Sequence, residues 1–266
     1  MTDVDASEWV GRELGSRDVT WDERDAILFA LSVGARSDQL DLVFEKNLRV
    51  LPTFGLTLAQ WAPDVLGAAG AFDVRTALHG SQRMSVHSPL PSSGGARLNA
   101  RVSAVWDKGR AAVFDVSVEC EYFTATWSIF APGQGGFGGA RGDSSPVLDR
   151  GVPDAVRPMP LAANSALLYR LSGDLHHIHV DPEAARGIGQ PRPILHGLAT
   201  LSTATLVLAD IAGVHPCDLA ELDGRFTSAV YPGETVDVLR WSDGAYVVQT
   251  ERGVAIQGGR ALFRAL

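Results

Sequence analysis

The feature that most constrains this chain is an internal repeat with a single offset. VLPTFGLTLAQWA in the first half resembles PILHGLATLSTAT in the second, and Gly197 lies 142 positions after Gly55. Another pair of similar stretches begins at Arg83 and Arg225, which are also 142 positions apart. Two matches at one offset indicate that each half is a copy of the same unit, a helix followed by a meander of strands.

A segment rich in glycine, proline and serine separates the two copies, over residues 131–158. This composition is typical of linkers and loops. With 266 residues, the chain is long enough for one large domain or two modest ones. We therefore predict a first domain over residues 1–130, a linker over 131–160 and a second domain over 161–266.

The expected helices and strands suggest how each copy folds. Residues 197–213 are apolar or small on nearly every helical face, which indicates a helix enclosed by other structure. Runs of strand-forming residues follow, joined by glycine turns, and are long enough to curl around that helix. A further helix is predicted over residues 20–34, where Thr20 and Glu23 have capping-box spacing. A helix wrapped by an antiparallel sheet is the hotdog fold, so the predicted class is α+β, a double hotdog.

Composition excludes several function classes. The formal net charge is −8 without a Lys/Arg cluster, which argues against nucleic acid as a partner. No apolar run approaches the length of a membrane span, so no membrane association is expected. The acidic start lacks an export signal, and we expect a cytoplasmic protein. Cys120 and Cys217 lack metal or redox spacing and are expected to be buried thiols.

Three of the seven histidines are crowded into SGDLHHIHVDP, residues 172–182. Such a cluster fits a metal site, a proton-transfer site or a histidine-rich turn. His177, His179 and Glu183 match a metal-binding string of cupins, but Asp181 and the following proline are expected to break the strand which that site requires. We therefore expect no metal ion.

A longer stretch, YRLSGDLHHIHVDPEAARGIGQPRPILHGL, resembles the signature of MaoC-like, (R)-specific enoyl-CoA hydratases. In that family Gly-Asp-x-Asn-Pro-aliphatic-His is followed by Asp-Pro and then by a Pro-aliphatic-x-His-Gly turn. LPTFG, LHGSQ, PLPSSGG, WDKGRAA and GQGGFGG are also similar to strings of double-hotdog members, so the resemblance covers nearly the whole chain. One departure stands out, because His176 and His177 replace the Asn-Pro pair.

The resemblance implies reversible hydration of a trans-2-enoyl thioester to a (3R)-3-hydroxyacyl thioester, without a cofactor. This reaction needs a base for water, an acid for the α-carbon and donors for the enolate oxygen. Asp174 and His179, five residues apart, can meet across a turn and act on one water. The first N–H groups of the helix at Gly197 lack intrahelical partners and form a positive site for the thioester oxygen. We expect His176 and Ser202 to contact the substrate.

The first copy lacks an Asp-x-x-x-x-His string at the corresponding place. We expect it to be non-catalytic and to cradle the substrate, with its buried helix shortened by Pro63 to admit a bulky or long acyl group. The expected partners are an acyl-CoA or acyl-carrier-protein thioester and a second copy of the chain in a homodimer.

Two other functions fit the same residues. One is a non-catalytic acyl-thioester-binding subunit, in which loss of the Asn-Pro pair marks decayed activity, and the other is a hotdog thioesterase. GQGGFG, residues 133–138, matches the glycine pattern of dinucleotide sites. No helix or βαβ unit is expected after it, so we predict a loop and no nucleotide cofactor.

Overall fold

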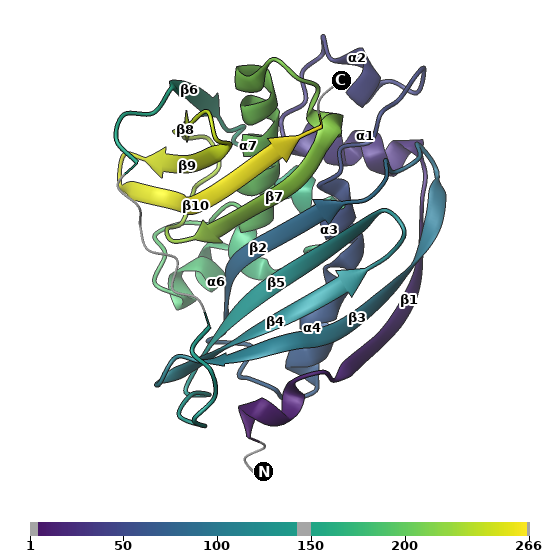
Figure 1. The fold of residues 1–266 in the computed structure, drawn as a ribbon. Coiled ribbons are helices and arrows are strands. Elements are labelled where there is room, and N and C mark those ends of the chain that lie inside the picture. Colours follow the sequence, from purple (N-terminus) through teal and green to yellow (C-terminus); the bar gives the residue numbers. More distant parts are fainter. Residues whose placement is uncertain (1–4, 143–149, 265–266) are drawn as a thin grey trace.

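The computed structural model describes residues 5–142 and 150–264. Its ten strands form one antiparallel sheet in the order β1-β3-β4-β5-β2-β7-β10-β9-β8-β6 (Figure 1). From the central β2–β7 pair outwards, the two halves repeat the same five-strand pattern. The strands are β1 (Glu13–Trp21), β2 (Leu78–Val86), β3 (Gly94–Asp107), β4 (Ala111–Glu119), β5 (Phe123–Pro132), β6 (Ala155–Pro160), β7 (Leu219–Phe226), β8 (Thr235–Arg240), β9 (Ala245–Thr250) and β10 (Gly253–Phe263).

The helices of both copies lie behind this sheet in the view of Figure 1. Short 3₁₀ turns, labelled η, connect several of them. The helices are α1 (Glu23–Ser32), α2 (Leu40–Val43), α3 (Phe54–Ala59), α4 (Trp61–Ala68), α5 (Ser165–Tyr169), α6 (Pro182–Gly187) and α7 (Gly197–Ala212), and the 3₁₀ turns are η1 (Ala6–Trp9), η2 (Arg170–Ser172), η3 (His177–His179) and η4 (Pro216–Asp218). None of the helices in the described ranges combines the length and apolarity needed to cross a bilayer.

The register between β2 and β7 reproduces the offset of the sequence repeat. Gln82 lies directly opposite Gly224, which is 142 positions later in the chain. Arg83 follows Gln82 on one strand, and Arg225 follows Gly224 on the other. A pseudo-twofold axis therefore passes through the Gln82–Gly224 pair, and the predicted double hotdog is confirmed.

The predicted buried helix of the second copy is α7, and it begins and ends within one residue of the expected bounds. Ten of its sixteen residues are buried, including Leu201, Ala204 and Leu208. It ends at Gly213, whose φ of 69° is left-handed and suits glycine. A helix enclosed on most sides explains the absence of a polar face in its sequence.

The equivalent helix of the first copy is divided into α3 and α4, with Gln60 between them. Pro63 is the third residue of α4, and it has no N–H with which to bond the carbonyl of Ala59. The missing hydrogen bond therefore interrupts the helix about one turn before Pro63. We predicted a shortened helix, whereas the structure has two short helices in succession.

Two other sequence predictions need correction. The N-cap of α1 is Asp22, whose carboxylate forms a capping box with Asp25, because Thr20 still belongs to β1. The segment expected to be a linker contains the end of β5 and all of β6. Pro158 and Pro160 are tolerated in β6 because an edge strand leaves one side of its backbone unpaired. Residues 143–149 of this segment lie outside the described residues.

The glycine-rich loop is attached to the first copy by a carboxylate. Asp107 accepts hydrogen bonds from the backbone N–H groups of Gly109 (2.7 Å), Gly136 (2.9 Å) and Gly138 (2.8 Å). These bonds hold the pKa of Asp107 below its ordinary value. The loop thus directs its glycine N–H groups at a side chain of its own domain.

The close packing around Gly224, at the pseudo-twofold axis, yields a prediction about stability. A Cβ atom at Gly224 would lie 2.8 Å from both Ile256 and the Tyr246 hydroxyl, and 3.2 Å from Leu201. Gly224→Ala should lower the free energy of unfolding by about 1–3 kcal/mol, because the closely packed centre cannot yield without strain. Chemical denaturation measures this change, with Gly187→Ala as the control because no atom lies within 4 Å of its added Cβ. Equal stability of the two variants would contradict this account.

Candidate active site

The loop after η2 places the acidic residue of the histidine cluster against the first copy. Gly173 has φ 134° and ψ −33°, a conformation that L side chains rarely adopt. A Cβ atom there would lie 3.7 Å from the carbonyl oxygen of Thr57 in α3. The sharp turn at Gly173 therefore directs the chain into Asp174 beside the interrupted helix of the other copy.

Asp174, His179 and His196 converge from three segments of the second copy. A carboxylate oxygen of Asp174 and one ring nitrogen of each histidine lie within 4.8 Å of one another. Both histidines are buried and Asp174 is half-buried. Separations of this size are suited to one water molecule bridging the carboxylate and an imidazole.

Hydrogen bonding determines which nitrogen of His179 is free. Its Nδ1 lies 2.9 Å from the carbonyl oxygen of Ile194. A carbonyl only accepts, so Nδ1 carries the proton and donates. In the neutral ring Nε2 then has an available lone pair, as a general base requires.

His196 supports this arrangement from the N-cap position of α7. Its ring stacks on His179 with centroids 3.6 Å apart, and Tyr169 packs 4.8 Å away. Nε2 of His196 lies 3.2 Å from the carbonyl oxygen of Asp174 and must donate to it. His196 thus holds the turn at the start of α7 and also ties the main chain of Asp174 to this helix.

Burial keeps both rings neutral at physiological pH. It lowers the pKa of His179, whose buried ring would have to lose hydration to carry a charge. It also lowers the pKa of His196, where proximity to His179 acts in the same direction. Neutral, stacked rings are consistent with a base on His179 and a hydrogen-bond donor on His196.

The N-terminus of α7 lies next to these histidines. The first intrahelical hydrogen bond runs from the Thr200 N–H to the His196 carbonyl at 3.0 Å, and no side chain caps the helix. The N–H groups of Gly197 and the next two residues therefore have no intrahelical acceptor and carry partial positive charge. A Cβ atom at Gly197 would lie 3.1 Å from the Phe226 ring, so glycine also satisfies a packing constraint.

The first copy contributes a wall to this site that the sequence did not reveal. His79 of β2 packs edge-on against Phe226, with ring centroids 4.9 Å apart. Burial lowers the pKa of His79 to about 4, and the negative charge of Asp174 partly opposes that shift. We missed His79 because only the β2–β7 pairing, and no local motif, brings it to Asp174.

The remaining candidates lie less directly at the site. His176 is exposed, and its Nδ1 accepts from the Ile178 N–H (3.3 Å), while its backbone N–H donates to Asp174 (3.1 Å). His177 is also exposed. Ser202 is fully buried in α7, and its hydroxyl has no hydrogen-bond partner among the described residues. The His176 side chain therefore caps a 3₁₀ turn, and the hydrogen bond between His176 and Asp174 comes from the His176 backbone.

The three converging groups are poorly arranged for a shared metal ion. The rings of His179 and His196 are nearly parallel, at 25°, and 3.6 Å apart. An imidazole binds a metal in its ring plane at about 2.0–2.1 Å, and two stacked planes cannot both contain one nearby ion. Within the described residues, His177 and Glu183 do not join any group of this kind.

Comparison with known proteins places this chain in a family. Residues 19–130 match the model of the MFE-2 hydratase 2 N-terminal domain, and residues 149–258 match the MaoC-like domain. The enoyl-CoA hydratase ChsH3 of Mycobacterium tuberculosis is 38% identical over 92% of each chain. The chain belongs to the MaoC-like enoyl-CoA hydratase family.

Two further relatives agree with this assignment. The 3-hydroxyacyl-thioester dehydratase Y of M. tuberculosis is 36% identical, over 87% of this chain and 86% of its own. A MaoC-like dehydratase from Phytophthora capsici superposes with a TM-score of 0.87 over 98% of both chains at 24% identity, which supports the fold. Asp174, His179 and Gly197 all lie within the residues that match the MaoC-like domain.

The buried histidines predict how stability changes with pH. Unfolded imidazoles titrate near 6.5, whereas burial lowers the pKa of His79, His179 and His196 in the folded chain. Below that pH the unfolded chain binds protons that the folded chain excludes, so the free energy of unfolding should fall between about pH 7 and 5. Denaturant titrations at several pH values measure the fall, and His79→Gln should make it shallower. A stability that is constant or rises on acidification would refute this.

Proposed function

We propose that this protein catalyses the reversible hydration of a trans-2-enoyl thioester to a (3R)-3-hydroxyacyl thioester. The observation that carries the proposal is the approach of the Asp174 carboxylate and the His179 imidazole to within 4.8 Å, beside the uncapped N-terminus of α7. The hydratase and dehydratase relatives support the same reaction, and the stereochemistry follows from the family resemblance.

In the hydration direction, one water is held between Asp174 and His179. Nε2 of His179 accepts a proton as the water oxygen bonds to C3, while the carboxylate accepts a hydrogen bond from the remaining O–H. Charge moves onto the thioester oxygen, which the N–H groups at Gly197 stabilise. The imidazolium then delivers its proton to C2, so the product gains one hydroxyl and one hydrogen and His179 returns to its neutral form.

The two rival functions differ in their products. A thioesterase would release free thiol and acid, and a binding subunit would leave the enoyl thioester unchanged. Chromatography of the products of an enoyl-CoA incubation separates all three, because only a hydratase forms a hydroxyacyl thioester without free thiol. The hydrogen bond from Nδ1 of His179 leaves Nε2 able to accept a proton from water, as hydration requires.

Mutation of the two proton-transfer residues tests the mechanism. Asp174→Asn and His179→Ala should each reduce kcat by at least about a hundredfold, because each removes one side of the water site. The double variant should be little worse than either single one, since both residues act on the same water. His177→Ala, at an exposed neighbouring position, is the control and should retain most activity. Near-normal turnover in either folded single variant would refute the assignment.

A pocket in the first copy supports a bulky acyl group as substrate. It has a volume of about 190 Å³ and adjoins Ser172, two residues before Asp174. Leu58 and Phe54 of α3 form part of its wall, together with Leu28 of α1. The pocket thus lies beside the divided helix, next to the loop that carries Asp174. We propose that this pocket holds the distal part of the acyl chain.

Filling the pocket tests this proposal. Leu58→Trp should reduce kcat/KM for a long or ring-bearing enoyl thioester by roughly tenfold or more, because the larger side chain excludes several methylene groups. Turnover of a four-carbon substrate should change little. Leu40→Trp, on the exposed surface of α2, serves as the control. The pocket has another role if both substrates are affected equally, or if the unmodified protein strongly prefers the four-carbon one.

Further elements of the proposal concern the cellular location, the oligomeric state, the carrier and the substrate contacts. We propose a cytoplasmic homodimer acting without a cofactor on a thioester carried by CoA or a carrier protein, with His176 and Ser202 contributing to substrate binding. Sedimentation analysis tests the oligomeric state, and cell fractionation tests the location.

A further inference from the structure

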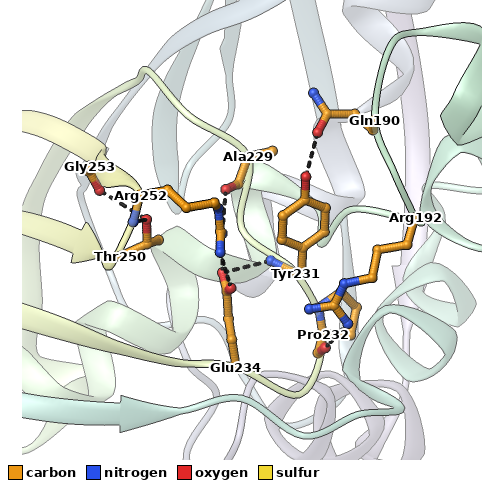
Figure 2. A network of polar contacts seen from close by, with 9 residues as sticks. All are labelled: Gln190, Arg192, Ala229, Tyr231, Pro232, Glu234, Thr250, Arg252 and Gly253. Carbon is orange, nitrogen blue, oxygen red and sulfur yellow. Dashed lines mark hydrogen bonds and ion pairs between the residues drawn. The ribbon is translucent and has the colours of Figure 1, made fainter.

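Two arginines hold one tyrosine beside the segment that orients the catalytic histidine. The guanidinium groups of Arg192 and Arg252 lie 4.7 and 4.6 Å from the centroid of the Tyr231 ring. Figure 2 shows the ring between the two arginines, with its hydroxyl bonded to Gln190 at 2.7 Å. The ring is buried, whereas both arginines are exposed. Such cation–π packing restrains the guanidinium groups and leaves their edges open to solvent.

The charges of this cluster do not balance. Glu234 forms an ion pair with Arg252 at 2.8 Å and also accepts the Tyr231 backbone N–H at 2.9 Å. Arg192 forms no ion pair among the described residues, and its hydrogen bond runs to the carbonyl of Pro232 at 3.2 Å. A guanidinium has more donors than this bond uses. One positive charge is therefore left without a counterion, in a chain whose formal net charge is −8.

The cluster is joined rigidly to the candidate active site. Arg192 lies two residues before Ile194, whose carbonyl fixes the proton on Nδ1 of His179. The N–H of Leu195 donates to the carbonyl of Val230 at 2.7 Å, next to Tyr231. Gly197 is five positions after Arg192, a reach of at most about 17 Å along the chain. A ligand whose reactive end lies at Gly197 can therefore extend a flexible arm towards Arg192.

We propose that Arg192, held on the Tyr231 ring beside Arg252, binds a phosphate group of the thioester carrier. The inference rests on the proposed function, because the pantetheine arm of an acyl thioester carries phosphate at the end remote from sulfur. A planar, fixed guanidinium matches two phosphate oxygens better than a flexible ammonium does. The same phosphate chemistry occurs in CoA and in the phosphopantetheine of a carrier protein.

The test uses one enoyl group on three carriers: CoA, 4′-phosphopantetheine and pantetheine without phosphate. Arg192→Gln should raise KM for the CoA ester roughly three- to tenfold with little change in kcat, and should leave the pantetheine ester unaffected. Arg192→Lys should fall in between. A matching loss with the phosphopantetheine ester assigns the contact to the phosphate shared with carrier proteins, whereas a loss confined to CoA assigns it to the nucleotide phosphates.

Arg157→Gln is the matched control, because Arg157 is also exposed and donates to a backbone carbonyl, that of Val156, at 3.2 Å. It should leave all three substrates unchanged. Equal losses with all three carriers after Arg192→Gln would show that Arg192 only supports the fold, and no loss with any would exclude a phosphate contact. Either result overturns the proposal.

Direct binding separates this proposal from the proposed function. If the unmodified protein hydrates none of the three esters, the hydratase function fails. Calorimetric titration with CoA then still tests the phosphate site. Weaker CoA binding by Arg192→Gln than by the unmodified protein and Arg157→Gln supports the site, and equal binding by all three proteins overturns it.

Discussion

The backbone ladder between β2 and β7 is the constraint on which the rest of the structure depends. Its register sets Gln82 against Gly224 and so fixes how the two copies of the unit face each other. With this register, His79 of one copy packs on Phe226 of the other, and Phe226 covers Gly197 at the start of α7. The candidate site thus draws Asp174, His179 and His196 from one copy and its wall from both. A slip of one residue would turn the side chains of β2 to the opposite face and dismantle that wall.

Within the second copy, several groups of the candidate site lie in one short segment, residues 192–197. The carbonyl of Ile194 sets the tautomer of His179, the ring of His196 stacks beneath it, and the N–H of Gly197 opens a positive helix end. Because these groups share one short stretch of backbone, the chain itself constrains their relative positions. Preorganisation of this kind is what electrostatic stabilisation of an enolate requires, since dipoles already oriented need not reorganise during the reaction.

The sequence predicted the repeat, α7 and the approach of Asp174 to His179, because each depends on local spacing or on an offset within the chain. It did not predict His79 or the cluster around Tyr231, because those contacts join residues distant in sequence through the sheet. The N-cap of α1 was placed two residues early, since β1 continues through Trp21 by pairing with β3. Strand β6 was assigned to the linker because its two prolines are a loop signal everywhere except at a sheet edge.

An open sheet of ten strands has two free edges, β1 and β6, and each could template pairing with another chain. In β6, Pro158 and Pro160 remove backbone donors from the free edge, while β1 has a register irregularity near Gly15 and exposed charged side chains at Arg17 and Asp18. Prolines, bulges and edge charges are known safeguards against edge-to-edge aggregation. The prolines that made this part of the chain resemble a linker therefore also have a second consequence: they disfavour pairing of the exposed β6 edge with another chain.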